Sequence, residues 1–281
     1  CLTLHGRPLE LLQAYLQPGA RLLVLTDDGN TAAKVSALLS RRGYGASKIT
    51  VLERMDAAEE NHVFGTAESW DTPQTDDLNT VAIECISGPG AQQLLSRTPG
   101  LPDDAFASDG QLTKREVRVV TLSALAPAPG DLLWDIGAGC GSIAIEWMRQ
   151  HQRNAAIAIE RDPSRVQMIA TNAAALGTPL LRTVTGDAAD SLNDLPQPDA
   201  VFVGGGIGTP GLLEQCWTAL APGGRLVANV VTTEGERVLF EWRENRGGEL
   251  RRLSIERAEQ VGRLTGWRPA MTVTQYFGCR S

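Results

Sequence analysis

Residues 132–147, LLWDIGAGCGSIAIEW, run from an apolar stretch through an acidic residue and three glycines into a second apolar stretch. This order predicts a buried strand, a tight turn and a helix. Glycine is needed where φ is positive or where the backbone approaches a ligand closely. Gly137, Gly139 and Gly141 therefore predict a loop in which a ligand lies against the N–H groups at the start of the helix. A tight turn without a ligand is the alternative interpretation.

The spacing of these glycines indicates which ligand the loop would take. A dinucleotide fingerprint places its third glycine at position 142, where this chain has Ser142. Asp135, at the end of the predicted strand, would crowd a pyrophosphate but can accept a hydrogen bond from a cationic or N–H-bearing group. The loop therefore favours an amino-acid-bearing nucleoside over a dinucleotide.

Two further strand ends carry residues suited to a nucleoside. Glu160 ends the strand predicted over 155–160, and a carboxylate there can hold both hydroxyls of a ribose. Asp187 and the backbone at Ala188, in the segment GDA, can meet an adenine edge. Because ligands bind open α/β sheets at the carboxyl ends of the strands, we expect these residues to converge on one ligand. Ordinary surface acids at strand ends are the alternative.

The order of strands and helices predicts the fold. Two α/β patterns occur, so we expect a first domain at residues 1–98, a linker at 99–110 and a second domain at 111–281. In the second, regular alternation predicts a doubly wound, mostly parallel sheet. The expected strands lie at 21–28, 48–55, 79–86, 131–136, 155–160, 181–188, 198–206 and 224–234. The expected helices lie at 31–43, 113–127, 142–152, 161–177 and 209–224, with Asp162 and Thr209 as N-caps of the last two.

Composition and charge exclude several classes of protein. The 281 residues are 42% hydrophobic and 21% charged, which supports buried cores in about two domains. A net charge of −7 disfavours nucleic acid and anionic membranes as partners, and no apolar run approaches the ~20 residues of a membrane span. The five cysteines form no CxxC pair and no Cys/His cluster, so we expect no metal site, no disulfide framework and a cytoplasmic setting. Because the chain opens at Cys1 without an initiator methionine, we interpret it as a piece of a longer protein.

Asp135, the GAGCG loop, Glu160 and the GDA segment together resemble class I methyltransferases that use S-adenosylmethionine, over about residues 110–280. The resemblance implies S-adenosylmethionine as cofactor and S-adenosylhomocysteine as product. It implies that the loop lies along the methionine and ribose, that Glu160 holds the ribose hydroxyls and that Ala188 lies at the adenine. The loop residues concerned are Gly137, Ala138, Gly139, Cys140 and Gly141.

The segments PDDAFASDGQLTKREVR (102–118) and DAVFVGGG (199–206) are similar to the decarboxylating corrin-ring methyltransferases of cobalamin biosynthesis. In that family the matching threonine contacts the cofactor, which carries over to Thr113, although a helix N-cap is the alternative for this residue. LTLHGR (2–7) and LLVLTDDGNTAAKVSALLSRRG (22–43) resemble the carboxyl half of a tetrapyrrole methylase. Both domains are fused in the precorrin-6Y C5,15-methyltransferase family.

This resemblance implies methylation at C15 of a precorrin with loss of CO2 from the ring C acetate. It also implies that the first domain is incomplete, so we expect no C5 methylation by this chain alone. The family further suggests a homo-oligomer. Another class I methyltransferase, acting on a small molecule or RNA, and a non-catalytic nucleoside-binding module are the alternatives.

The expected substrate is a carboxylate-rich tetrapyrrole, and two features suit it. Gly204, Gly205 and Gly206 can admit a flat macrocycle close to the backbone, with a flexible loop as the alternative. Residues 243–281 hold eight arginines and four acids, and arginine forks bind carboxylates well. The pattern singles out no individual arginine, and it indicates no general acid or base.

Overall fold

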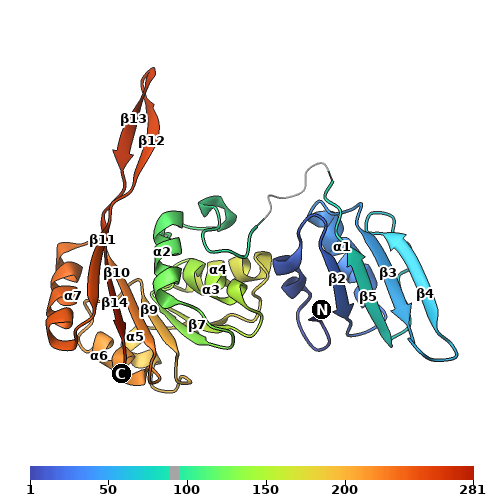
Figure 1. The fold of residues 1–281 in the computed structure, drawn as a ribbon, viewed down its shortest axis with the longest axis horizontal. Helices are drawn as coiled ribbons and strands as arrows, with labels where there is room; N and C mark the ends of the chain where they lie inside the picture. The colour runs from blue at the N-terminus through green and yellow to red at the C-terminus, as the bar shows by residue number, and fades with distance from the viewer. Residues whose placement is uncertain (89–94) are drawn as a thin grey trace. The chain divides into compact units, whose positions relative to one another are not determined.

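A computed structural model describes residues 1–88 and 95–281 of the chain (Figure 1). The chain divides into two compact units. The amino-terminal unit comprises residues 1–96 and 174–179, and the carboxy-terminal unit comprises 97–173 and 180–281. No helix in the described ranges has both the length and the apolar character needed to cross a membrane.

The amino-terminal unit is a five-stranded sheet with one α-helix. Its strand order is β1 (Leu2–Thr3), β2 (Arg21–Leu25), β5 (Asn79–Glu84), β3 (Lys48–Glu53) and β4 (Asn61–Thr66). The short 3-10 helix Leu9–Tyr15 and helix α1 (Thr31–Arg41) complete it. The strands expected from their apolar runs are confirmed as β2, β3 and β5. Strand β4 was not predicted, because most of its residues are exposed or half-buried and form no apolar run.

The carboxy-terminal unit contains a seven-stranded sheet. Its order is β11 (Glu249–Leu253), β14 (Val273–Cys279), β10 (Arg225–Val230), β9 (Ala200–Val203), β6 (Leu132–Ile136), β7 (Ala155–Glu160) and β8 (Arg182–Thr185). The five strands from β10 to β8 are parallel, and β14 is antiparallel to both of its neighbours. This confirms the doubly wound sheet. The chain moves outward from β6 to β8 and then returns to β9 on the other side of β6. Such a switch point is where ligands bind in these sheets.

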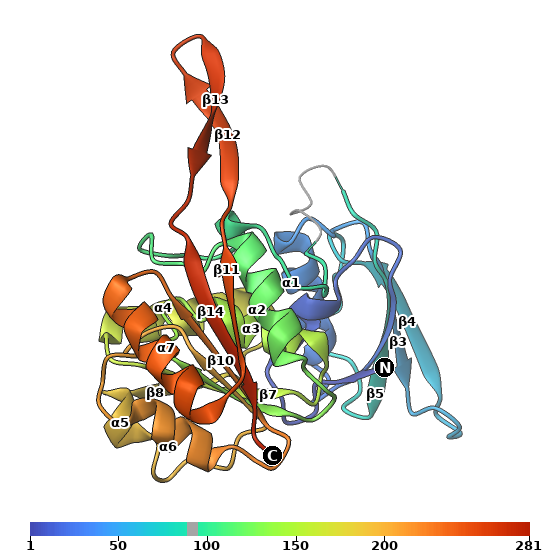
Figure 2. The ribbon, with the colours of Figure 1, turned by 60° about the vertical axis from the view of Figure 1, so that its left-hand side comes forward.

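Helices cover both faces of this sheet because successive strand residues point to opposite sides. On β6, Leu133 packs in a core with α2 (Arg115–Leu125), α3 (Ser142–Gln150) and α4 (Pro163–Ala175). The next residue, Trp134, packs in a core with α6 (Leu212–Ala219) and α7 (Thr233–Arg246). The short helix α5 (Ala188–Ser191) follows β8. Figure 2 shows α5, α6 and α7 together at one side of the sheet.

The ends of the helices test the predicted caps. Asp162 accepts hydrogen bonds from the Ser164 N–H (2.8 Å) and hydroxyl, which confirms it as the N-cap of α4. The N-cap predicted at Thr209 is wrong: α6 begins at Leu212 after Gly211, which has φ +78°, because Thr209 lies in a separate preceding turn. Helix α7 was not predicted. Only Gly235 and Leu239 of α7 are buried, which leaves no apolar stripe to recognise.

Strands β12 (Glu256–Val261) and β13 (Leu264–Pro269) form a hairpin between β11 and β14. It projects beyond the edge of the main sheet (Figures 1 and 2). The residues after 248 alternate in a way typical of exposed or antiparallel strands; β11 to β14 form antiparallel pairs, although β14 is largely buried.

Candidate active site

A cavity of about 1010 Å³ lies at the carboxyl ends of β6, β7 and β9. It is lined by the glycine loop, by the turns after β7, β8 and β9, by residues 110–117 and by the base of the hairpin. The sequence-predicted residues that line it are Thr113, Gly137, Ala138, Gly139, Cys140, Glu160, Asp187, Ala188, Gly204, Gly205 and Gly206. Asp135 and Gly141 are not among the lining residues.

The glycine loop has the backbone conformation that its sequence predicted. Gly137, Gly139 and Gly141 have φ values of +68°, +59° and +80°, in the left-handed region that favours glycine. The N–H groups of Gly137 and Ala138 donate to the carbonyl of Ile159 at 3.0 and 3.2 Å, which ties the loop to the end of β7. Gly141 is the N-cap residue of α3, and Ser142 and Ile143 in the first turn of that helix line the cavity.

Glu160 lies at the centre of the residues that converge here. One carboxylate oxygen accepts from the Gly139 N–H at 2.9 Å, and the other accepts from the Asp162 N–H at 3.1 Å. The backbone carbonyl of Glu160 accepts from the Gly186 N–H at 3.2 Å. The ends of β6, β7 and β8 are therefore joined by hydrogen bonds through this one residue.

Asp135 has a different position from the other predicted residues. Its side chain is almost fully buried and accepts from the Ala144 N–H at 3.0 Å, in the first turn of α3. Its other oxygen, Oδ1, has no hydrogen-bond partner among the described residues. The pKa of the Asp135 carboxyl is raised to about 7, mainly by burial and in smaller part by the nearby charge of Glu160, against the lowering effect of the Ala144 N–H. Asp135 thus fixes the start of the helix behind the loop.

Cys140 lies in the glycine loop between Gly139 and Gly141. It is buried, and burial raises the pKa of its thiol. A buried thiol of raised pKa is a poor nucleophile, which fits a packing role.

The loop after β9 packs closely against the glycine loop, a contact that the sequence did not reveal. A Cβ on Gly137 would lie 2.6 Å from the Gly205 nitrogen, and a Cβ on Gly204 would lie 2.8 Å from the Phe202 ring. The Gly204 N–H donates to the Ile136 carbonyl at 2.8 Å. The loops after β6 and β9 therefore meet backbone to backbone at the switch point. This contact links two loops far apart in the chain, so loop-by-loop reading of the sequence missed it.

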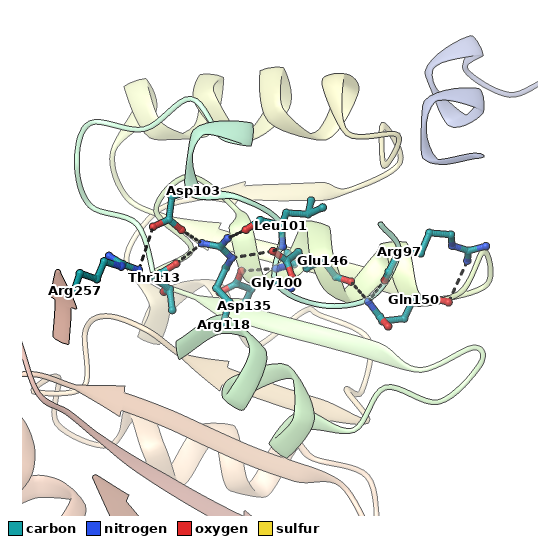
Figure 3. Close-up of polar contacts among 11 residues, drawn as sticks. Arg97, Gly100, Leu101, Asp103, Thr113, Arg118, Asp135, Glu146, Gln150 and Arg257 are labelled. Atoms are coloured by element: carbon teal, nitrogen blue, oxygen red, sulfur yellow. Dashed lines mark hydrogen bonds and ion pairs between the residues drawn. The ribbon is translucent and has the colours of Figure 1, made fainter. Parts of the chain in front are cut away.

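Residues 99–110, expected as a linker, belong to the wall of the carboxy-terminal unit. The N–H groups of Gly100 and Leu101 donate to the buried carboxylate of Glu146 on α3, at 2.6 and 3.0 Å. Arg118 on α2 is fully buried, binds the same carboxylate at 2.8 Å and also binds the Leu101 carbonyl (Figure 3). The glycine- and proline-rich composition of this segment indicated a linker, whereas its hydrogen bonds to Glu146 order it.

Thr113 follows this wall into the cavity. Helix α2 begins at Arg115 with Lys114 in the N-cap position, so the alternative of Thr113 as an N-cap is wrong. The Thr113 carbonyl accepts from Arg118 at 2.5 Å, which fixes the backbone at the point where its side chain meets the cavity. Sequence reasoning missed Arg118 itself, because an arginine on an amphipathic helix is expected at the surface.

The strand order, the glycine loop and the cavity at the switch point are those of class I methyltransferases dependent on S-adenosylmethionine. The chain belongs to the precorrin methyltransferase domain family, whose sequence profile matches residues 104–280. This confirms the family expected from the sequence.

Three relatives illustrate the match. A decarboxylating precorrin-6Y C(5,15)-methyltransferase of Sinorhizobium sp is 47% identical over 274 residues, covering 98% of this chain and 66% of the relative. A probable cobalt-precorrin-6B C(15)-methyltransferase of Pyrobaculum aerophilum is 34% identical, covering 64% of this chain and 96% of the relative. The crystal structure of the C-terminal domain of a Rhodobacter capsulatus precorrin-6Y C5,15-methyltransferase is 45% identical, with a TM-score of 0.63, and covers 66% of this chain and 100% of that chain. The chain spans about two thirds of the length of its first curated relatives.

The raised pKa of Asp135 predicts a specific pH dependence of stability. Between about pH 4 and pH 7 the folded chain keeps a proton on Asp135 that the unfolded chain releases, so stability falls as pH rises. From about pH 5 to pH 8, this group should lower the free energy of unfolding by about 2–3 kcal/mol. Asp135→Asn should remove this contribution, as measured by denaturant unfolding at both pH values.

The exposed carboxyl of Asp104 offers the matched control, since Asp104→Asn should leave the wild-type slope unchanged. An Asp135→Asn variant with the same fall in stability as wild type would show that Asp135 is ionised throughout this range.

Proposed function

We propose that the carboxy-terminal unit binds S-adenosylmethionine in the cavity and transfers its methyl group to C15 of a precorrin, with loss of CO2 from the ring C acetate. The supporting observation is the joining of the Gly139 loop, Glu160 and the Asp187–Ala188 turn around one cavity. The names of the relatives supply the substrate class. The Sinorhizobium relative is also named for C5, and for this chain we propose C15 as the only position methylated.

The residues present fit an S-adenosylmethionine molecule. A Cβ on Gly139 would meet only the Gln111 carbonyl, at 3.5 Å, so the backbone of the loop is open to a ligand. Glu160 and Asp187 supply carboxylates to a ligand with hydroxyls and positive charge, and Ile136 and Ile159 supply apolar surface. When bound, the cofactor supplies an electrophilic methyl group on a sulfonium.

The protein's own contribution to the reaction is to position the two reactants. Glu160 and the Gly139 loop orient the ribose end, and the wall from Gly110 to Val117 closes one side of the cavity. Holding two reactants in line can supply roughly 7–11 kcal/mol of the barrier. For the decarboxylation, the carboxylate leaves as CO2, the electron pair of the broken C–C bond passes into the conjugated macrocycle, and the remaining CH2 carbon takes up a proton to become a methyl group.

Mass spectrometry of the product tests the reaction. Incubation with S-adenosylmethionine and precorrin-6Y should give a tetrapyrrole that has gained one methyl group and lost CO2. Two methyl groups gained would contradict methylation at C15 alone. An unchanged tetrapyrrole, with cofactor bound, would favour methylation of another small molecule or RNA.

Glu160→Gln tests the cofactor site. Loss of the charged acceptor should weaken S-adenosylhomocysteine binding about 10- to 100-fold, since a hydrogen bond to a charged group contributes roughly 1.5–3 kcal/mol. Asp162→Asn is the control, because this neighbouring residue does not line the cavity and asparagine also caps helices well. Calorimetry measures both, and equal affinities in the two variants would place the ribose elsewhere. Binding of NAD by the wild type would favour a dinucleotide module.

We also propose that the chain forms a homo-oligomer through the β12–β13 hairpin. Val261, Leu264 and Trp267 are 67%, 76% and 72% exposed. A hairpin of only two strands is marginally stable in water unless another surface covers it. Leu264→Ser with Trp267→Ser should lower the molar mass measured by light scattering to that of one chain. Wild-type chain that is already monomeric would contradict this proposal.

The remaining proposals concern partners and location. With a net charge of −7, the chain carries no general attraction for nucleic acid or anionic membranes, so we propose neither as a partner. The five cysteines are all free thiols, three of them buried, which suits a reducing compartment. We therefore propose a cytoplasmic enzyme.

A further inference from the structure

One arginine of residues 243–281 differs from the other seven in its position at the cavity. Of the eight arginines in residues 243–281, only Arg257 is among the described residues that line the cavity. Four of the others form ion pairs elsewhere: Arg246 with Glu214, Arg251 with Glu249, Arg252 with Glu236, and Arg268 with Glu259. Arg280 binds the backbone carbonyls of Thr218 and Leu220. The structure thus selects one arginine where the sequence could not.

Arg257 lies at the base of the hairpin, where β12 leaves the main sheet. Ile255, Ala270 and Met271 line the cavity beside it, and the Ala270 N–H donates to the Ile255 carbonyl at 2.8 Å. The Arg257 side chain is 42% exposed, so a ligand in the cavity can reach it.

Two acids position the guanidinium of Arg257. Its Nη2 lies 2.5 Å from Glu116 Oε2 and 4.0 Å from Asp103 Oδ2. Within the described part of the chain, its Nε and Nη1 have no hydrogen-bond partner, so donors remain for a ligand. The other Asp103 oxygen binds Arg118 at 2.8 Å, and Arg118 binds the buried Glu146 (Figure 3). Arg257 therefore stands at the end of a chain of alternating charges that begins in the core.

Lys114 provides a second cation on the same wall. It lines the cavity, is exposed, and has no ion-pair partner in the described ranges. Of the other two cations of the cavity, Arg161 directly follows Glu160 at the proposed ribose end, and Arg165 in the first turn of α4 pairs with Asp109 at 2.8 Å. Lys114 and Arg257 are thus the cations on the side formed by the wall and the hairpin.

We propose that Arg257, assisted by Lys114, binds a carboxylate side chain of the tetrapyrrole and so determines how the macrocycle enters the cavity. This inference rests on the proposed function, which supplies a substrate rich in carboxylates. Arginine is suited to this role because its planar N–H donors match a carboxylate. Glu116 occupies the guanidinium when no substrate is present and is displaced, or shares it, when the substrate carboxylate arrives.

Equilibrium titration with precorrin-6Y in the presence of S-adenosylhomocysteine, followed by absorbance, tests the assignment. Arg257→Gln should weaken tetrapyrrole binding about tenfold or more, the loss expected for a hydrogen bond to a charged group. Its affinity for S-adenosylhomocysteine should stay within about twofold of wild type, as a site separate from the cofactor requires. Arg257→Lys should restore only part of the loss.

Two comparison variants separate ligand binding from a structural role. Arg268 is the cross-strand neighbour of Arg257, is 75% exposed and does not line the cavity, so Arg268→Gln should bind the tetrapyrrole as wild type does. Glu116→Gln removes the acid that competes for Arg257 and should bind the tetrapyrrole as tightly as wild type or more tightly. If the ion pair only held the hairpin in place, both Arg257→Gln and Glu116→Gln would weaken binding alike.

The outcomes distinguish this inference from the proposed function. If wild type binds the tetrapyrrole and Arg257→Gln binds it with equal affinity, the role of Arg257 is overturned but the proposed function is not. Equal weakening by Arg257→Gln and Glu116→Gln overturns it in favour of a structural tie. Wild-type chain that binds S-adenosylhomocysteine but no tetrapyrrole overturns the proposed function, and the inference with it.

Discussion

The buried ion pair between Arg118 and Glu146 is the interaction on which the site depends. Both side chains are almost completely withdrawn from water, and Glu146 also accepts the N–H groups of Gly100 and Leu101. Removing one partner from such a pair typically costs about 3–5 kcal/mol, because a charge is left buried and unpaired. The pair therefore does more than join α2 to α3. It orders the segment that leads into residues 110–117, which form one wall of the cavity.

The second constraint is the contact of two glycine loops at the switch point. Gly137 and Gly205 approach so closely that a side chain on Gly137 would overlap the Gly205 backbone. This contact sets the floor of the cavity, while Glu160 joins the loop to β7 and β8. The wall is thus held by a buried ion pair, whereas the floor is set by the close packing of two backbone loops. Between the wall and the floor, the Gly139 backbone is open toward the cavity.

A feature of this structure could be predicted from the sequence when the contacts that determine it lie close together along the chain. Gly139 and Glu160 were predictable, because each strand and the loop after it form a continuous pattern with a known place at the sheet edge. The order of the segment 100–113 was not predictable, because it depends on Glu146, about 45 residues further along the chain. Helix α7 was not predictable either, since it buries too few residues to produce a periodic pattern. The glycines after β9 were recognised as a feature, but their packing against Gly137 appears only when both loops are placed.

The same distinction separates the proposed cofactor side of the cavity from the proposed substrate side. The residues that we propose for the cofactor come from three successive strand ends, so a short stretch of sequence contains their pattern. Arg257 and Glu116 are 141 residues apart and meet only because the hairpin leaves the sheet beside the start of α2. The loops at the ends of the parallel strands carry the proposed cofactor residues, whereas residues 110–117 and the hairpin lie outside those strands. Under the proposed function, we expect selectivity for the acceptor to come from these two segments.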